Sequence, residues 1–205
     1  MRADKVIVRA ILSTDAAIVV LFGFMMLALV AFYPSTLMHV AYDLGMDEAS
    51  IKNARRAYER SDEVYYIAFA TEVAIGSDDY GEIEKCGERF ILDDGFDGYC
   101  AARDQEYGET GAYERYVQAQ VCTAKYRLGK KDDAVSKAFA FTGNTFPKNN
   151  AVVGVLITAI SARDITCVES IKNRMEDIST EIPETDKEDF DKLLQIATAF
   201  LQTEE

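Results

Sequence analysis

The chain has 205 residues and a formal net charge of −13, with 35 acidic against 22 basic side chains. A surface this acidic repels phosphate groups, so binding to nucleic acid is not expected. Hydrophobic residues make up 49% of the chain and prolines number only three, a composition that excludes a disordered protein and favours helices over strands.

The first predicted element is a membrane-spanning helix. Residues 16–33 (AAIVVLFGFMMLALVAFY) carry no charged side chain. At a rise of about 1.5 Å per residue the run covers about 27 Å, close to the hydrocarbon thickness of a bilayer. It is longer than the apolar core of a secretory signal peptide, and no small-x-small cleavage motif follows it. With its flanks, the predicted transmembrane helix covers residues 11–33.

The charges that flank this helix predict its orientation in a cell membrane. No Lys or Arg occurs between Tyr33 and Lys52, whereas three basic residues precede the helix. The positive-inside rule therefore places residues 1–10 in the cytoplasm as a short tail and residues 34–205 outside the cytoplasm. Asp15 either reaches headgroup water or pairs with a basic residue of a partner transmembrane helix. The three preceding basic residues are Arg2, Lys5 and Arg9.

Residues 34–45 are expected to form a juxtamembrane segment, followed by a helical domain over residues 46–205. Apolar side chains recur there at helical spacing, without the alternation that indicates strands. The turns are short, so consecutive helices are expected to pack as antiparallel hairpins. The least regular stretch, residues 93–111, holds a short helical piece at 99–105. Helices are predicted at residues 46–60, 62–75, 80–92, 113–128, 132–142, 151–160, 166–178 and 185–201.

One hairpin carries a repeat signature. In residues 116–147 (YVQAQVCTAKYRLGKKDDAVSKAFAFTGNTFP), Gly129 ends the first helix and Pro147 closes the unit. Small and aromatic side chains occupy fixed offsets in the second helix, at Ala134, Ala138 and Phe141. This unit resembles a tetratricopeptide repeat, and Leu44-Gly45 followed by ARRAYERS resembles part of a second one. The resemblance implies an all-α solenoid of stacked hairpins. The alternative is a generic helical bundle.

The sequence offers little catalytic chemistry. His39 is the only histidine, and no partnered nucleophile lies near it in the sequence. Neither a phosphate-binding loop nor a dinucleotide fingerprint occurs. Residues 93–98 (DDGFDG) weakly resemble a calcium loop, but Asp104 stands where that loop requires glutamate. We therefore expect no enzyme activity, no cofactor, no metal ion and no small-molecule substrate.

The four cysteines fit no zinc-binding spacing. Each falls in a predicted helix beside apolar residues, which favours buried thiols. A disulfide between Cys86 and Cys100 is the alternative, because the domain is expected to face an oxidising compartment. The other two cysteines are Cys122 and Cys167.

The predicted function is a membrane-anchored scaffold or adaptor that binds protein partners. In a solenoid of hairpins, one set of helices lines a concave groove. The family resemblance implies that the first helix of each hairpin lines this groove. The alternative is an accessory or assembly subunit of a larger membrane enzyme or transporter, which it would contact through residues 11–33. The residues predicted to contact a partner in the groove are Tyr65, Glu72, Tyr116, Thr123, Tyr126 and Arg127.

The orientation can be tested by protease protection. Protease added outside intact cells should digest residues 34–205 and spare the N-terminal tail, because the basic flank holds that tail in the cytoplasm. Fragments are detected with epitope tags at the two ends, and cells permeabilised with detergent serve as the control. Full protection of residues 34–205 in intact cells would contradict this orientation.

Overall fold

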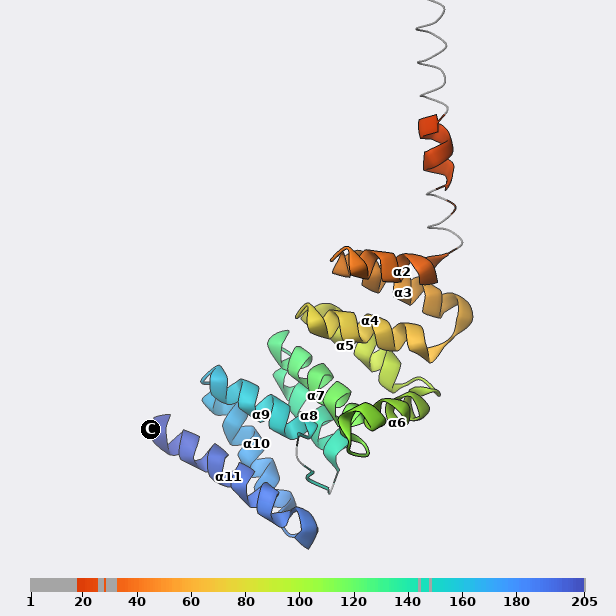
Figure 1. Ribbon diagram of the computed structural model, residues 1–205. Coiled ribbons are helices and arrows are strands. Elements are labelled where there is room, and N and C mark those ends of the chain that lie inside the picture. The colour runs from red at the N-terminus through yellow and green to blue at the C-terminus, as the bar shows by residue number, and fades with distance from the viewer. Residues whose placement is uncertain (1–17, 26–27, 29–32, 144, 148, 205) are drawn as a thin grey trace, which may run out of the picture. The chain divides into compact units, whose positions relative to one another are not determined.

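The computed structural model describes residues 18–25, 28, 33–143, 145–147 and 149–204 (Figure 1). All regular structure in these residues is helical, which confirms the predicted all-α class. Each helix predicted after residue 45 is present at nearly its predicted bounds. The helices are α2 (Pro34–Asp43), α3 (Asp47–Ser61), α4 (Val64–Gly76), α5 (Tyr80–Ile91), α6 (Phe96–Tyr107), α7 (Ala112–Arg127), α8 (Lys131–Thr142), α9 (Ala151–Ser161), α10 (Ile165–Ile178) and α11 (Glu184–Glu204).

Most of the predicted transmembrane segment, residues 11–33, lies outside the described residues, as does the predicted tail at 1–10. Residues 18–25 are helical, and the large apolar side chains among them are exposed. Across the part of the chain that the structure describes, no helix combines the length and apolarity needed to cross a membrane. The membrane span and its orientation remain predictions.

The chain divides into two compact units, residues 1–62 and 63–205. In the first unit, α2 and α3 pack along each other. The Ser50 hydroxyl on α3 donates a 2.8 Å hydrogen bond to the backbone carbonyl of Met38 on α2. Gly45 makes the turn between the two helices at a φ of 67°, a conformation that glycine adopts at little cost. The sequence predicts residues 34–45 only as a juxtamembrane segment, whereas the structure forms α2 there and buries Pro34, Met38 and Ala41.

In the second unit, the pairs α4–α5, α7–α8 and α9–α10 form hairpins, and α11 packs against α10 and α9 (Figure 1). Each second helix also contacts the first helix that follows, as α5 contacts α7, α8 contacts α9 and α10 contacts α11. The first helices α7, α9 and α11 lie side by side. The hairpins of this unit are therefore arranged in sequence order.

Helix α6 is inserted between the first two hairpins of this unit and packs against α7 and α4. It has twelve residues where the sequence predicts only a short piece. Asp104 of α6 caps α7, since its carboxylate accepts hydrogen bonds from the backbone N–H groups of Gly111 at 2.5 Å and Tyr113 at 2.9 Å. Residues 93–111, which interrupt the repeat period, thus supply the side chain that caps the N-terminus of α7.

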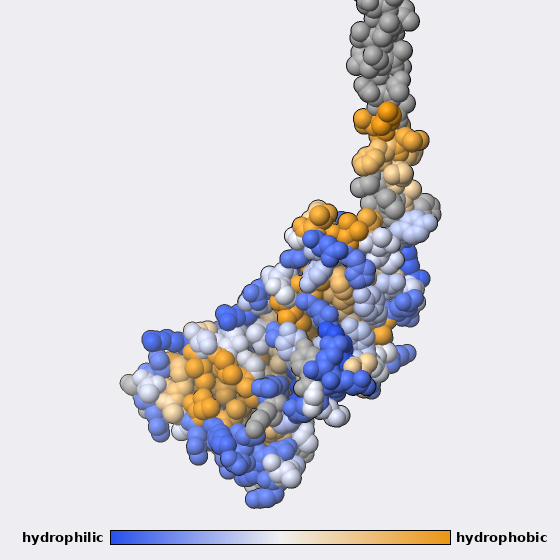
Figure 2. Space-filling model, in the orientation of Figure 1, coloured by the Kyte–Doolittle hydropathy of each residue, from blue (hydrophilic) through white to orange (hydrophobic). Residues whose placement is uncertain are grey.

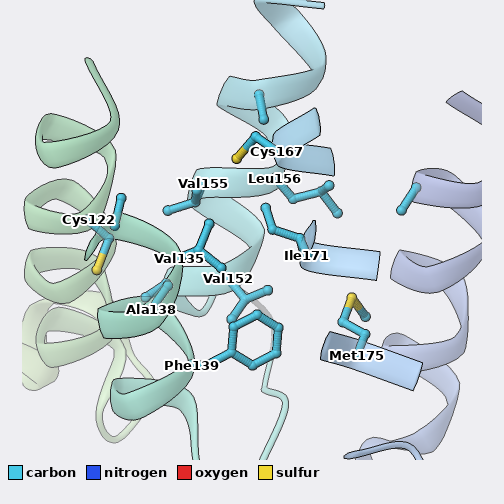
Figure 3. Close-up of a cluster of buried hydrophobic side chains, with 14 of the residues drawn as sticks. Cys122, Val135, Ala138, Phe139, Val152, Val155, Leu156, Cys167, Ile171 and Met175 are labelled. Carbon is cyan, nitrogen blue, oxygen red and sulfur yellow. The ribbon is translucent and has the colours of Figure 1, made fainter. Parts of the chain in front are cut away.

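One apolar cluster of the second unit runs from α7 to α11 (Figure 3). Ala138 and Phe139 of α8 face Val152 of α9, and Met175 of α10 closes the cluster toward α11 (Figure 3). All four cysteines are buried free thiols, so the structure contains no bond between Cys86 and Cys100. Burial raises the pKa of the Cys122 thiol to about 12, which keeps it protonated and apolar at neutral pH.

Polar contacts join the hairpins where charged side chains are buried. The ammonium of Lys125 on α7, a residue only 5% exposed, lies 3.0 Å from a Glu84 oxygen, 2.9 Å from a Glu88 oxygen and 2.6 Å from an Asp133 oxygen. Burial alone would lower the pKa of Lys125, but hydrogen bonds to the three carboxylates outweigh burial and raise it. Lys125 therefore ties α5, α7 and α8 together as a cation.

Substituting Ala138 tests the packing of the central hairpin. Ala138 is 1% exposed, so Ala138→Glu places a carboxylate without a partner in the core and should cost several kcal/mol of stability. The matched control is Ala140→Glu, the same change at an exposed position of α8. We expect a large fall in Tm for the first variant and little change for the second. Equal melting temperatures for Ala138→Glu and wild type would contradict this packing.

Lys125→Met tests the buried ion pairs through their pH dependence. Burial acts to raise the pKa of Glu84 and Glu88, but hydrogen bonds from lysines outweigh it and hold both below the ordinary value of 4.5. A carboxyl group whose pKa is lowered by folding stabilises the fold at pH values above its ordinary pKa. This stabilisation is lost as the pH falls through the pKa of the folded state. We expect Lys125→Met to cost about 3 kcal/mol at pH 7, and the deficit to shrink below about pH 4.

The measurement is urea unfolding followed by circular dichroism at both pH values. Lys130→Met is the control, because the Lys130 side chain is 52% exposed while its partner Glu84 is only 13% exposed. Water screens the Lys130 ammonium, and Glu84 keeps its pair with Lys125 in this variant, so it should lose much less stability. A deficit for Lys125→Met that is identical at both pH values would instead assign the effect to packing of the lysine stem.

Candidate protein-binding face

A cluster of tyrosines surrounds Glu72 where α4, α6 and α7 meet. The hydroxyl of Tyr113 on α7, a residue 1% exposed, donates a 2.5 Å hydrogen bond to the Glu72 carboxylate. The same oxygen accepts a 3.1 Å hydrogen bond from the Arg103 guanidinium on α6. This guanidinium also lies over the Tyr113 ring, 5.4 Å from its centroid. Glu72 therefore holds three helices in place through its carboxylate.

The phenols of this cluster are held protonated. Burial, followed by the negative charge of Glu72, raises the pKa of Tyr99 to about 12. Burial and the hydrogen bond to Glu72 raise the pKa of Tyr113 further. Tyr65 is 41% exposed, and burial together with Glu72 raises its pKa as well. A phenol at its ordinary pKa of 10 is already neutral at physiological pH, so these hydroxyls are hydrogen-bond donors there and remain so at higher pH.

The structure gathers three of the residues predicted to bind a partner around this cluster. Tyr65 packs against Phe69 on its own helix, with ring centroids 6.2 Å apart, and lies near Glu72. The half-buried ring of Tyr116 lies 6.3 Å from that of Tyr113. Tyr65, Glu72 and Tyr116 thus lie around one tyrosine cluster of α4 and α7, with the carboxylate of Glu72 engaged inside it.

The other three predicted residues lie further along α7. Thr123 is half-buried where α7 meets α9, and a Cβ added at Gly154 would lie 3.2 Å from its hydroxyl oxygen. Arg127 is exposed at the end of the helix. Tyr126 is only 5% exposed, and its hydroxyl donates a 2.8 Å hydrogen bond to Asp164 before α10. Tyr126 therefore joins neighbouring hairpins and offers little surface to a partner.

Sequence reasoning missed part of this face. The ten apolar residues of α9 predict a core helix, yet Ile157 is 58% exposed. On the neighbouring helix α11, Ile196 is 52% exposed. Figure 2 shows an apolar patch in the region of α9 and α11. One feature of the sequence could have indicated this exposure, namely the length of the apolar run in α9. A helix that is covered by neighbours on a single side leaves part of such a run exposed to solvent.

The described residues present no assembled metal site. Among them, no group of three or more His, Cys, Asp or Glu side chains is placed to hold a metal ion. His39, the only histidine of the chain, is exposed on α2 of the first unit. The side chains that the structure brings together in the second unit are mainly phenols, carboxylates and basic groups held in ion pairs.

No family model matches the chain, and neither a curated protein nor a solved structure matches it significantly. Function must therefore be inferred from the residues themselves. Two kinds of surface are available on the first helices of the second unit: neutral tyrosines around Glu72, and exposed isoleucines on α9 and α11. Both suit contacts with a protein, since aromatic and apolar side chains dominate the energetics of protein interfaces.

Proposed function

We propose that the chain is a membrane-anchored interaction module whose second unit binds a protein partner across its first helices. The observation that carries this proposal is that each of these first helices carries an aromatic or apolar side chain that is exposed or half-buried. Tyr65 on α4, Ile157 on α9 and Ile196 on α11 are each more than 40% exposed, and Tyr116 on α7 is half-buried. Covering such side chains removes apolar surface from water, which favours association.

The order of the hairpins supports a solenoid similar to tetratricopeptide repeats. In such an array each hairpin contacts only its neighbours, and one set of helices lines an extended binding surface. The contacts of α5 with α7, of α8 with α9 and of α10 with α11 follow this scheme. Ala134 and Ala138 are both buried, as the repeat offsets require for two helices that approach closely. We propose α4, α7, α9 and α11 as the lining helices.

The chemistry of this face favours contacts that persist in salt. Neutral phenols donate hydrogen bonds to backbone carbonyls and present flat apolar rings, and neither interaction depends on net charge. The overall acidity of the chain adds long-range attraction for a basic partner, which raises the rate of encounter. That attraction is screened over about 8 Å at physiological ionic strength. We therefore assign binding energy mainly to the tyrosines and isoleucines.

A membrane anchor at residues 11–33 would keep this face near membrane proteins and raise its effective concentration toward them. The second candidate function is an accessory or assembly subunit of a larger membrane complex. In that case the anchor itself makes the specific contacts, and Asp15 is a candidate for pairing with a partner helix. Exchanging residues 11–33 for an unrelated membrane helix separates the two: recovery of the partner survives only if the helical face binds.

The binding face is tested by a double variant. We expect Tyr116→Ala with Arg127→Ala to reduce partner recovery from crosslinked membranes about tenfold at about 0.3 M salt, where surface charge is largely screened. The matched control is Tyr80→Ala with Lys85→Ala, which removes an aromatic and a basic side chain from the second helix α5. Both variants should keep the helical circular dichroism and Tm of wild type within a few degrees.

The result is decided by comparing the two double variants in the same pull-down. Loss confined to the α7 variant supports binding through the first helices. Equal recovery with both variants and with wild type, together with loss on exchange of residues 11–33, would replace this proposal by the accessory subunit. Ile157→Glu provides an independent check, because it places a charge in the proposed interface at a site that is already exposed.

A further inference from the structure

Helix α11 carries a second surface, on the side that faces α10. A groove of about 450 Å³ lies there, and α10 contributes one residue, Glu176, to its lining. Its remaining lining comes from α11 at a spacing of three or four residues, which forms one stripe along the helix. These α11 residues are Asp191, Leu194, Gln195, Thr198, Ala199 and Gln202.

The stripe has the dimensions of a helix-binding surface. From Asp191 to Gln202 it covers three turns, which corresponds to about 16 Å along the axis. Thr198 and Ala199 are small, so another helix can approach α11 closely there. In the hairpins of this unit each of the first helices α4, α7 and α9 has a second helix packed beside it.

Charge is distributed unevenly along the groove. Residues 176–191 contain eight acidic side chains and one basic side chain, Lys187, whereas residues 193–203 of α11 contain no charged side chain. The last turn of α10 has no basic residue to offset the negative end of its helix dipole. Of the residues that line the groove, only Glu176 and Asp191 are charged, so the groove is negative where α10 meets α11 and uncharged over the rest of its length.

The acidic lining residues are held only by weak surface pairs. Glu176 accepts from Lys172 one helical turn away at 2.6 Å, and Asp191 lies 3.8 Å from Lys187. Both carboxylates are about half exposed, with side-chain exposure of 49%. Ion pairs of this kind, one helical turn apart and half exposed to water, are weak, so a cation from a partner can replace the internal lysine at little cost.

We propose that the groove between α10 and α11 binds an amphipathic helix of a partner protein with lysine or arginine side chains at one end. The basic end lies beside Glu176 and Asp191, and small or apolar side chains pack over Leu194 and Ala199. The bound helix runs alongside α11, as second helices do beside their first helices in this unit. This site is separate from the face formed by the first helices.

The test uses a fluorescent helical peptide of 18 residues with an Ala/Leu stripe and three lysines in its last turn. Binding to the full-length chain in nanodiscs of neutral phosphatidylcholine is measured by fluorescence anisotropy, with empty nanodiscs as the blank. A second peptide carries glutamates in place of the lysines. We expect at least about tenfold tighter binding of the lysine peptide, because charge complementarity selects between the two.

Two pairs of variants locate the binding. Asp191→Lys should weaken lysine-peptide binding about tenfold, while Glu188→Lys should change it less than about twofold. Glu188 is 83% exposed on the same helix, outside the groove, so this control alters net charge equally. Ala199→Trp should block the groove, whereas Thr203→Trp on the same helix should not. Circular dichroism checks that all four variants remain folded.

Equal effects of Asp191→Lys and Glu188→Lys, or equal affinity for the two peptides, would overturn the proposal in favour of nonspecific attraction. Sedimentation of the full-length chain tests a second copy as occupant: a dimer that Ala199→Trp dissociates would also overturn it. The double variant Tyr116→Ala with Arg127→Ala should bind the peptide like wild type. Failure of this site therefore leaves the first-helix proposal untouched, and the reverse also holds.

Discussion

The second unit depends on the close packing of α7 against α5, α6, α8 and α9. This packing requires two glycines on the neighbouring helices. A Cβ added at Gly87 of α5 would overlap Cγ2 of Val121, and one added at Gly154 of α9 would press on Thr123. Because these positions carry no side chain, the backbones approach closely enough for the core of α7 to be buried on several sides. The position of α7 then determines where the tyrosine cluster and the neighbouring first helices lie.

The hairpins of this unit stack through apolar contacts. Polar contacts between successive hairpins add to this packing. Glu84 of α5 binds Lys125 of α7, and the Tyr126 hydroxyl binds Asp164 ahead of α10. Toward the C-terminus, the Asp186 carboxylate of α11 accepts a 2.8 Å hydrogen bond from the backbone N–H of Phe146. Apolar stripes tolerate small shifts along a helix, whereas buried charged groups must meet their partners or lose several kcal/mol. These contacts therefore favour one register between successive hairpins.

The two surfaces proposed for binding differ in chemistry although they lie in the same unit. The first helices present neutral phenols and isoleucines, while the groove between α10 and α11 is acidic at one end and uncharged elsewhere. Partners suited to one surface are poorly suited to the other, since an acidic groove selects cations and a phenol-rich face does not. The two proposals together imply a unit that holds two different segments at once.

The sequence by itself determined the all-α class and, apart from the full extent of α6, the helices after residue 45, because most of them carry apolar residues at helical spacing. It also predicted that Ala138 is buried and favoured buried cysteines over a disulfide between Cys86 and Cys100, and the structure buries all five side chains. Helix α2 lies in residues that the sequence predicted only as a juxtamembrane segment, because they follow directly on the apolar run of residues 16–33. Only the tertiary structure decided that Tyr126 is enclosed while Ile157 is exposed, because exposure depends on which neighbouring helix covers each face. The gathering of Tyr65, Glu72 and Tyr116 around one tyrosine cluster likewise arises from contacts between α4, α6 and α7, which are distant in sequence and therefore leave no local pattern.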